Sequence, residues 1–570
     1  MISKVTLEYF KKFDKEEFHL GDAIVLAGPN NSGKSTLLQA VSVWNLAVQR
    51  WRQERGINKS KATLHTGVPV SRKDFTAIPL REMNLLWTDR DTAYSKDEKP
   101  STKPGQPKLV IIGMEGEGPG SEPWQVKVSL RYTSREQIYV KLLDKDDKPL
   151  IDLPPGANKT QVVHIPPFSG IGAEETRYDH GFQNLLIGQG KPGDILRNLL
   201  LEIFTKNPEN WKQLKEDIKE LFDYVIVDPS YAEHDPFIVV EYCHSVGRKS
   251  FDLASAGSGF HQVLTLFGFI YAREASVLLI DEPDAHEHII LQRQVYERLR
   301  TVARRRNCQL LVSTHSEVIL EETSPQEILS FYGKPHPIRV DEQRDQVREA
   351  LRHLSSLDIL ETESGHKILY TESDSDLNIL SVFAKTLAHK SVQFFNHPFH
   401  HPLNGSHPRE AKNHFFALKS ISPHIQGILI LDRDNKEVPE HDILTDGIEI
   451  VRWGRYEIEN YLLVPNAILR YIKNVTKFEG DLFQASLIKK AEQFLKEKFP
   501  PDALQNPLSD NAFLTKIAAS KDILPQLFAI VGLNVSKKDY YQIAGLFEIN
   551  EIHPDIKKAL DKIADYLISR

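Results

Sequence analysis

The feature that most constrains this chain is the segment 28–35, which reads Gly-Pro-Asn-Asn-Ser-Gly-Lys-Ser and matches the pattern Gly-x-x-x-x-Gly-Lys-Ser. It follows an apolar run over residues 23–27 and precedes an amphipathic segment over 36–48, which is the strand, loop and helix context of a phosphate-binding P-loop. The glycines let backbone amides and a helix N-terminus face phosphate, while Lys34 adds a charge and Ser35 can hold Mg²⁺. The alternative, a glycine-rich turn without nucleotide, is disfavoured by this context. The residues predicted to bind ATP are Gly28, Asn30, Asn31, Ser32, Gly33, Lys34, Ser35 and Thr36.

Length and composition set the broad class of the protein. With 570 residues, 41% apolar and 26% charged, the chain should form about three or four folded domains with ample core. Its longest apolar runs fall far short of the roughly 20 residues that a membrane span needs, and its first residues do not read as a secretory signal. Two cysteines give no disulfide or zinc framework and suit a reducing compartment. We therefore expect a cytoplasmic protein without a membrane segment.

The net charge of −7 argues against a protein coated in basic residues for nucleic acid. Basic residues are nevertheless concentrated in one region, because residues 50–108 contain 13 Lys/Arg and 7 Asp/Glu. This region is either a surface for a polyanion or a solvated loop region. We favour the solvated loop.

Carboxylates and a histidine follow two strands of a predicted parallel sheet. Strands and helices alternate between residues 250 and 317, which is typical of α/β structure. Asp281 and Glu282 directly follow the apolar strand 276–280, so they should lie at the carboxyl edge of the sheet, where open α/β folds bind ligands. One carboxylate can hold Mg²⁺ through water and the next can position the attacking water. His315 follows the strand 309–313, within reach of a γ-phosphate.

Other periodic runs predict the rest of the architecture. Residues 2–10 and 16–20 indicate a hairpin, and an antiparallel β region is expected from runs at 108–114, 124–132 and 137–143. We expect a loop over 164–170, a strand over 237–242 and helices over 195–222, 262–271 and 289–306. A second α/β unit should have strands over 367–371, 392–395, 427–431 and 448–453 and helices over 375–387, 410–421 and 459–464. The tail, 465–570, is expected to be mostly helical.

Acidic residues gather at three strand ends of this second unit. They occur in Glu-Ser-Asp-Ser-Asp over 372–376, in Asp432-Arg433-Asp434 and in Glu-Ile-Glu-Asn-Tyr over 457–461. Each alone would be read as a solvated turn or helix cap. Carboxylates collected at one sheet edge repel one another unless cations are present, and such oxygen ligands suit Mg²⁺ or Mn²⁺. We therefore predict a metal site formed by Glu372, Asp432, Asp434 and Glu459.

Five histidines are crowded into the region 397–414. A histidine metal site is one interpretation, but their spacing follows no regular helix or strand pattern, so we favour a polar surface loop. The residues are His397, His400, His401, His407 and His414.

The nucleotide motifs resemble those of the overcoming-lysogenization-defect (OLD) family, whose ATPases belong among ABC/SMC-type heads. The matching segments are 28–35, 255–262, 278–286 and 313–316. The resemblance implies that Lys34 and Ser35 contact phosphate and Mg²⁺, that Asp281 binds Mg²⁺, that Glu282 is the base and that His315 senses the γ-phosphate. It also implies a homodimer or higher homo-oligomer, in which a segment of one subunit completes the ATP site of another. That segment contains Ser255, Gly257, Ser258 and Gly259, and since it departs from the usual Leu-Ser-Gly-Gly-Gln order, the serine that contacts phosphate stays open.

The acidic segments resemble a Toprim domain, the metal-dependent fold of topoisomerases, primases and OLD-family nucleases. The resemblance makes Glu372 the lone glutamate after the first strand and Asp432 and Asp434 the Asp-x-Asp pair, while Glu459 lies in a motif similar to that of Toprim-like defence nucleases. Ser373 replaces the glycine that usually follows the glutamate. No downstream Ser-x-Lys is evident, so a catalytic lysine is not assigned.

We expect an α/β protein with an ABC/SMC-like ATPase domain over 1–340, including an insert over about 50–250, and a linker over 341–365. A Toprim-like domain over 366–465 and a helical region over 466–570 would follow. The leading hypothesis is a phage-defence protein in which an ATPase dimer controls a nuclease acting on DNA or tRNA-like RNA, with a phage protein as trigger. The alternative is an ATPase sensor or clamp whose acidic domain does not cut. A recombination or repair ATPase of the SMC-like group would need long heptad repeats between the ATP motifs, and the sequence contains none.

Overall fold

The computed structural model describes residues 1–57, 67–95, 105–118, 122–232, 236–245, 249–283, 289–403, 409–433, 446–477 and 480–568. The chain divides into two compact units, Met1–Leu351 and Arg352–Arg570. Both are mixed α/β structures with a parallel sheet, as the strand and helix alternation predicts. No helix in the described part of the chain is both long enough and apolar enough to cross a bilayer.

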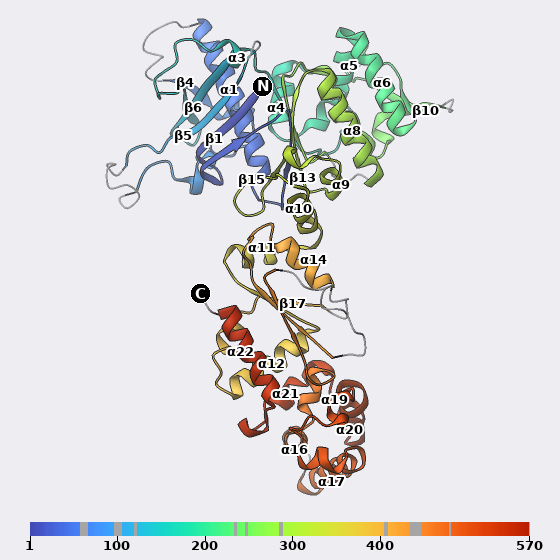
Figure 1. Cartoon of the computed structure of the whole chain (residues 1–570). Helices are drawn as coiled ribbons and strands as arrows, with labels where there is room; N and C mark the ends of the chain where they lie inside the picture. Colours follow the sequence, from blue (N-terminus) through green and yellow to red (C-terminus); the bar gives the residue numbers. More distant parts are fainter. Residues whose placement is uncertain are drawn as a thin grey trace. The chain divides into compact units, whose positions relative to one another are not determined.

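An antiparallel sheet of six strands, in the order β2-β1-β5-β6-β7-β4, forms one layer of the first unit. Its strands are β1 (Ile2–Phe10), β2 (Phe13–His19), β4 (Val68–Ser71), β5 (Val110–Glu117), β6 (Pro123–Ser134) and β7 (Gln137–Leu143). The predicted hairpin and antiparallel region are confirmed by the pairing of β1 with β2 and of β5, β6 and β7. Helix α1 (Lys34–Ile57) packs on this sheet, where the buried Trp44 donates a hydrogen bond from Nε1 to the Val126 carbonyl at 3.1 Å (Figure 1).

The second sheet of this unit has the order β15-β14-β3-β13-β12-β8 and is parallel from β14 to β8. Its strands are β3 (Ala23–Ala27), β8 (Val162–Ile165), β12 (Val277–Asp281), β13 (Gln309–Thr314), β14 (Ile328–Ser330) and β15 (His336–Pro337). Strand β8 corrects the predicted loop over 164–170, because His164 and Ile165 pair with β12. Around this sheet lie α7 (Ser258–Ala272), α8 (Ile289–Arg305) and α9 (Glu317–Glu321).

The single helix predicted over 195–222 is two helices, α5 (Leu196–Lys206) and α6 (Pro208–Phe222). Pro208 lacks an N–H and suits the first position of a helix. The Asn207 side chain caps α6 by accepting a hydrogen bond from the backbone N–H of Asn210 at 3.2 Å. The break therefore has a local cause that apolar spacing alone does not reveal.

A small antiparallel sheet and two short helices complete the first unit. The strands are β9 (Tyr224–Ile226), β10 (Glu241–His244) and β11 (Phe251–Asp252), and the helices are α3 (Pro155–Lys159) and α4 (His180–Gly188). Only the end of the strand predicted over 237–242 belongs to β10, because Phe237 and Val239 make isolated bridges instead. Residues 341–365, predicted as a linker, are largely helical in α10 (Asp341–His353) and α11 (Ser356–Glu363).

The second unit contains a parallel sheet of order β17-β16-β18-β19, made of β16 (Ile368–Thr371), β17 (His400–Pro402), β18 (Gly427–Leu431) and β19 (Ile448–Arg452). Both faces are buried, as is usual for a parallel sheet. Leu369 and Ile428 belong to the core shared with α12 (Asp374–Thr386), whereas Tyr370 and Leu429 belong to the core under α14 (Arg409–Leu418).

Two predictions for this unit are wrong. Residues 392–395, read as a strand from their apolar and aromatic character, begin α13 (Val392–Asn396), where Phe394 and Phe395 pack into the core. Tertiary burial outweighs the β propensity of this short run. His414, read as part of a surface loop, lies in α14 and is only 2% exposed.

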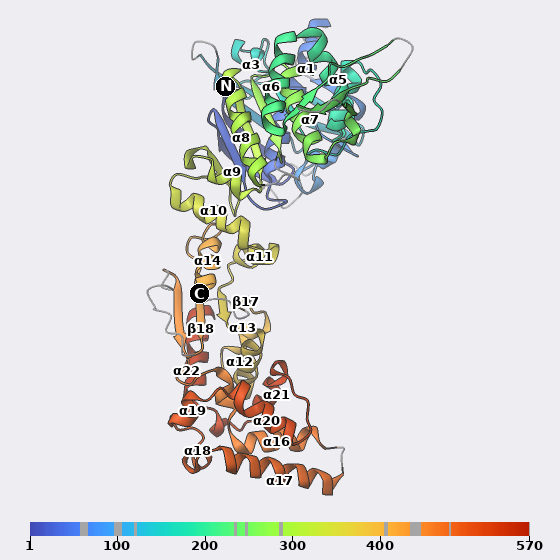
Figure 2. The ribbon, with the colours of Figure 1, turned by 90° about the vertical axis from the view of Figure 1, so that its right-hand side faces the viewer.

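Helices follow the sheet along the rest of the chain, and α16 to α21 gather at the end of the unit away from α11 and α14 (Figure 2). They are α16 (Pro465–Val475), α17 (Asp481–Lys498), α18 (Pro501–Gln505), α19 (Ala512–Lys516), α20 (Leu524–Ile530), α21 (Tyr541–Ala544) and α22 (Pro554–Ile563). Their apolar side chains join the core on the α12 face of the sheet. The sheet and the helical tail thus share one core on this face.

Candidate functional sites

The P-loop connects β3 to α1, and its geometry requires glycine at positions 28 and 33. Asn31 and Gly33 have φ values of 60° and 110°, which curl the loop so that its N–H groups can face one ligand. A Cβ on Gly28 would lie 2.9 Å from Cβ of Phe331, and one on Gly33 would lie 2.6 Å from the Phe13 ring. Larger residues would therefore displace the loop from the sheet.

Lys34 is held inside this loop. Its Nζ donates hydrogen bonds to the carbonyls of Gly28 and Pro29, at 2.7 and 2.8 Å, and the residue is 4% exposed. Asn30 and Asn31 are exposed, whereas Ser35 and Thr36 are half-buried at the start of α1. The Ser32 hydroxyl is buried and lacks a hydrogen-bond partner. The loop thus offers a buried cation and an unused hydroxyl to an anionic ligand.

Asp281 lies beside the P-loop serine. The Ser35 hydroxyl donates a hydrogen bond to Asp281 Oδ1 at 3.0 Å, and the Ser313 hydroxyl donates to the same oxygen. Asp281 ends β12 and is in register with Ser313 of β13, which explains how residues distant in sequence meet. Burial raises the pKa of Asp281, and the two hydroxyls oppose this effect. Ser35 and Asp281, the predicted magnesium ligands, are therefore adjacent and supply the hard oxygen donors that Mg²⁺ prefers.

Glu282 and His315 also lie together. His315 Nδ1 is 3.7 Å from Glu282 Oε1, and its interaction with the carboxylate lowers the pKa of Glu282 despite partial burial. Glu282 has a φ of 52°, an uncommon conformation for a residue with a side chain, and Gln262 donates from Nε2 to its carbonyl at 3.3 Å. An ionised carboxylate in a constrained backbone is suited to accept a proton from a bound water.

The segment expected to act on a second subunit's nucleotide begins α7. Gly257 is the N-cap residue, and Ser255, Gly257 and Ser258 are exposed, with Gly259 half-buried. The Ser255 hydroxyl donates a hydrogen bond to the Asp252 carbonyl at 2.7 Å. The exposed N-terminus of this 15-residue helix can therefore meet an anion from outside its own chain.

Carboxylates of the second unit converge at the carboxyl edge of its parallel sheet. Glu372 directly follows β16 and Asp432 directly follows β18. Burial and the neighbouring Glu372 carboxylate raise the pKa of Asp432 far above its ordinary value, and the charges of Asp376 and Glu459 add to this effect. Burial likewise raises the pKa of Asp376, and it raises that of Glu459 to about 7. Three of the predicted metal ligands thus share one site with Asp376, while Asp434 lies outside the described residues.

The sequence interpretation missed Lys537, which lies in this cluster. Its Nζ is 3.0 Å from Glu459 Oε1, and Glu459 is completely buried. Although burial opposes its charge, the carboxylates of Glu459 and Asp376 raise the pKa of Lys537. Lys537 directly follows Ser536 in the tail, so it is not the lysine of a Ser-x-Lys pattern, and nothing local connects it to the acidic residues.

The residues around Glu459 explain how it is positioned. Glu457 accepts hydrogen bonds from the backbone and hydroxyl of Ser520, and Asn460 Nδ2 donates to the carbonyls of Leu514 and Ile517 at 2.8 and 2.7 Å. These bonds tie the 3-10 turn 458–462 to the helical tail. Glu459 is the acidic residue of this turn whose side chain faces the cluster, and apart from the Lys537 ion pair its two buried oxygens lack hydrogen-bond partners.

Comparison with known proteins supports an ATPase. Residues 178–320 match a family model described as "AAA ATPase domain", and this segment contains Asp281, Glu282 and His315. No curated protein matches the chain.

Solved structures with overall similarity include SMC head domains. The head from Thermotoga maritima has a TM-score of 0.33 and 14% identity, and the match covers 60% of this chain and 99% of that one. An SMC head bound to the C-terminal winged-helix domain of ScpA has a TM-score of 0.33 and 12% identity, covering 58% of this chain and 93% of that one. An SMC head with an extended coiled coil bound to the C-terminal domain of ScpA, from Pyrococcus furiosus, has a TM-score of 0.32 and 11% identity, with 58% and 92% covered. The assignment therefore depends on the family match and the site geometry.

Proposed function

We propose that the first unit is an ABC/SMC-type ATPase and that the second unit is a Toprim-like nuclease that cuts phosphodiesters with Mg²⁺ or Mn²⁺. The observation that carries the proposal is the convergence of Glu372, Asp432 and Glu459. They follow three different strands of the second unit and share one buried site with Asp376. Mutually repelling carboxylates are costly to bury unless cations compensate them.

Unsatisfied oxygens in this site support the metal assignment. Asp432 Oδ1 and, apart from the Lys537 ion pair, both oxygens of Glu459 are buried without hydrogen-bond partners, and carboxylate oxygens are the ligands that Mg²⁺ and Mn²⁺ prefer. Glu372, Asp432 and Glu459 would hold the ions, which when bound would activate water and stabilise charge on the phosphodiester. Lys537 is the cation that the protein itself supplies, and it would contribute a positive charge for a phosphate oxygen.

In the ATP site, we assign to each residue the role that the sequence motifs predict and that its position supports. Lys34 and the loop amides bind phosphates, Ser35 and Asp281 hold Mg²⁺, and Glu282 accepts the proton of the attacking water. His315 keeps Glu282 ionised and meets the γ-phosphate. The exposed Ser258 and its neighbours complete the site of a second subunit, so ATP binding would promote a homodimer or higher homo-oligomer.

We infer further that the ATPase dimer regulates the nuclease in defence against phage, with DNA or tRNA-like RNA as substrate and a phage protein as trigger. The support for this role is the resemblance of both sets of motifs to OLD-family and Toprim-like defence proteins.

A nicking experiment tests the proposal. The full-length protein is incubated with Mn²⁺ and a panel of plasmid, linear DNA and total RNA, with and without ATP. Asp432→Ala should abolish cutting, whereas Lys34→Ala should abolish ATP hydrolysis and leave basal metal-dependent cutting. Asp374→Asn is the matched control, since this acidic side chain begins the same helix as Asp376 but is 74% exposed. Cutting that survives Asp432→Ala would refute the nuclease assignment.

One observation favours a second candidate, an ATPase sensor or clamp with a non-cutting acidic domain. Lys537 already compensates Glu459, so the site contains a protein cation without any metal. In this case Mn²⁺ would neither bind to the acidic site nor support cutting, and the wild-type protein and Asp432→Ala would behave alike in the nicking experiment.

A further inference from the structure

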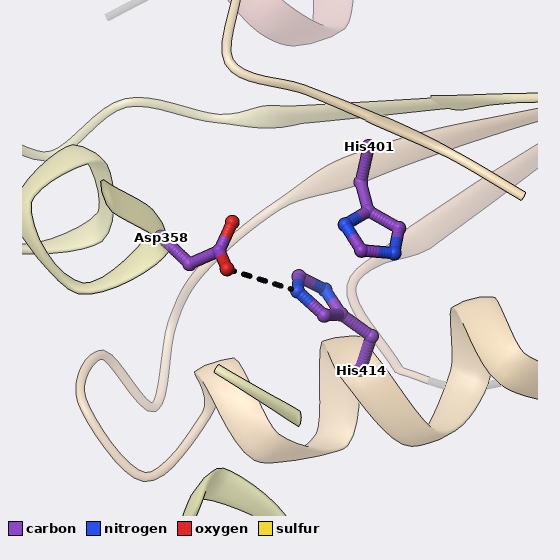
Figure 3. A group of neighbouring side chains, drawn as sticks. All are labelled: Asp358, His401 and His414. Atoms are coloured by element: carbon purple, nitrogen blue, oxygen red, sulfur yellow. Dashed lines mark ion pairs between the residues drawn. The ribbon is translucent and has the colours of Figure 1, made fainter. Parts of the chain in front are cut away.

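Two histidines and an aspartate lie together in the second unit, on the face of its parallel sheet opposite to α12. Asp358 comes from α11, His401 from β17 and His414 from α14, and one ligand atom of each lies within 4.8 Å of the others (Figure 3). The imidazole rings of His401 and His414 stack with centroids 4.0 Å apart and an interplanar angle of 27°. His414 Nε2 is 3.6 Å from Asp358 Oδ2. Three separate elements thus bring one nitrogen or oxygen atom each into the same cluster.

His414 has a buried nitrogen without a partner. The residue is 2% exposed, and its Nε2 makes no hydrogen bond in the described structure, since 3.6 Å to Asp358 is too long for one. A buried polar atom without a partner is costly, and native proteins rarely leave one so. Nε2 faces the carboxylate and lies in a ring stacked on a second imidazole. A cation shared by the three side chains would give this nitrogen a partner.

The surrounding hydrogen bonds fix the cluster in place. Tyr370 is fully buried, and its hydroxyl oxygen lies 2.9 Å from Nδ1 of His414. Asp358 is held by Ser355, whose backbone N–H and hydroxyl donate to Oδ2 at 2.8 and 2.6 Å in the capping box of α11. Metal-binding histidines and carboxylates in proteins are oriented by such partners. A hydrogen bond from Nδ1–H to the Tyr370 oxygen would leave the Nε2 lone pair directed into the cluster.

We propose that Asp358, His401 and His414 bind a zinc-class divalent cation that fastens α11 and α14 to the edge of the sheet. Two imidazoles and a carboxylate are a common protein ligand set for zinc, with a fourth position left for water. Glu410 and His353 are further ionisable groups close to His401. Zinc bonds of about 2.0–2.1 Å place tetrahedral ligand atoms roughly 3.3 Å apart, so binding would bring the three ligand atoms closer together and turn the two stacked rings apart.

A second group in the same unit shows why this cluster is distinct. Asp510, His553 and Asp555 also lie close together, but they include one histidine, and its Nδ1 accepts a hydrogen bond from the backbone N–H of Asp555 at 3.1 Å. Asp510 has a side chain that is 69% exposed. Ion pairing and helix capping account for these residues without a metal.

Zinc binding to the full-length protein tests the proposal. The protein is stripped with a chelator, loaded with excess Zn²⁺, desalted and analysed for bound zinc, and Co²⁺ is used in parallel to record the visible spectrum of a nitrogen-ligated ion. Affinity is measured by competition with a chromogenic chelator. His401→Ala and Asp358→Asn each remove one proposed ligand, so each variant should bind one equivalent of zinc less than the wild type. Tyr370→Phe should weaken binding about 10–100-fold, as expected for a partner that orients a ligand.

Two controls isolate the site. His397→Ala removes an exposed histidine from the same region and should bind zinc like the wild type. Asp432→Asn, in the carboxylate cluster, should leave this equivalent of zinc and the Co²⁺ spectrum unchanged, which also separates this proposal from the proposed nuclease site. Circular dichroism establishes that each variant is folded, and Asp358→Asn replaces His401→Ala if the latter does not fold. A wild-type protein that retains no zinc at micromolar concentration, or a folded His401→Ala that retains as much as the wild type, would overturn the proposal.

Discussion

The ionisation of Glu459 makes the stability of the second unit depend on pH in a direction opposite to that of an ordinary ion-paired carboxylate. Burial raises the pKa of Glu459 from 4.5 to about 7. The unfolded chain releases this proton near pH 4.5, whereas the folded unit keeps it until about pH 7. Between these values the folded state holds this extra proton, so the contribution of Glu459 to stability decreases as the pH rises and levels off above 7.

The size of this effect follows from the difference between the two pKa values. At about 1.4 kcal/mol for each pH unit, the interval from 4.5 to about 7 corresponds to a loss of about 3 kcal/mol. Glu459→Gln keeps the shape of the side chain and removes its charge, so this contribution to the pH dependence should disappear in the variant. Lys537 is 43% exposed in the wild type and can turn its ammonium group to water. A divalent cation bound by the wild-type carboxylate should restore stability at pH 8.

Hydrogen exchange in increasing urea measures the pH dependence of the stability of the second unit. Peptides from β18 and from residues 457–464 report on this unit alone. The free energy of opening is determined at pH 5, 6, 7 and 8, with a chelator and with Mn²⁺, after correction for intrinsic exchange rates. The wild type should lose stability from pH 5 to 7 in chelator, and the variant should lose about 2 kcal/mol less over this interval. Identical pH profiles for the two proteins would refute the idea that Glu459 is a buried ionisable group in a metal site.

Other predictions concern catalysis and the P-loop. Glu282→Gln should reduce ATP hydrolysis by about 10²–10⁴-fold and leave ATP binding intact, because it removes a proton acceptor; light scattering with ATP should then show an oligomer, and a stable monomer would contradict the shared ATP site. Lys537→Met should lower metal-dependent cutting by about 100-fold with the protein folded, by loss of a cation beside the reacting phosphate; unchanged cutting would make Lys537 purely structural. Gly33→Ala should abolish ATP binding in a titration with fluorescent ATP, because its φ is 110° and the added Cβ would meet the Phe13 ring at 2.6 Å; normal binding would show that the loop tolerates another conformation.

The sequence predicted best what depends on local order. The P-loop, the strand before it and the carboxylates at the end of β12 are contiguous motifs, so their placement follows from the strand and helix that flank them. β18 coincides with its predicted bounds because a run of five buried apolar residues ends directly at Asp432. Residues 392–395 show where such reasoning fails, because a short apolar run is compatible with a strand or a helix and tertiary packing decides between them.

Long-range pairing accounts for what the sequence did not reveal. Lys537 reaches Glu459 because the tail folds back against the 3-10 turn, where Glu457 accepts a hydrogen bond from Ser520 and Asn460 donates one to Leu514. No sequence pattern records that path. The same applies to His414, whose partners Asp358 and His401 come from different elements. The proposed site would take only His401 and His414 from the five histidines, one from a strand and the other from a helix, so no regular spacing connects them.

Donor chemistry separates the two proposed cation sites of the second unit. The cluster of Glu372, Asp432 and Glu459 offers oxygen atoms, which suit Mg²⁺ and Mn²⁺, whereas His401 and His414 add imidazole nitrogens, which favour zinc. The two sites would have different roles, since one would act on a phosphodiester and the other would hold α11 and α14 to the sheet. Chelation should therefore have two separable effects: Mn²⁺ alone should restore cutting, and Zn²⁺ alone should restore protection of α11 and α14 from hydrogen exchange. If Mn²⁺ restored both at micromolar concentration, the histidine cluster would have no metal role of its own.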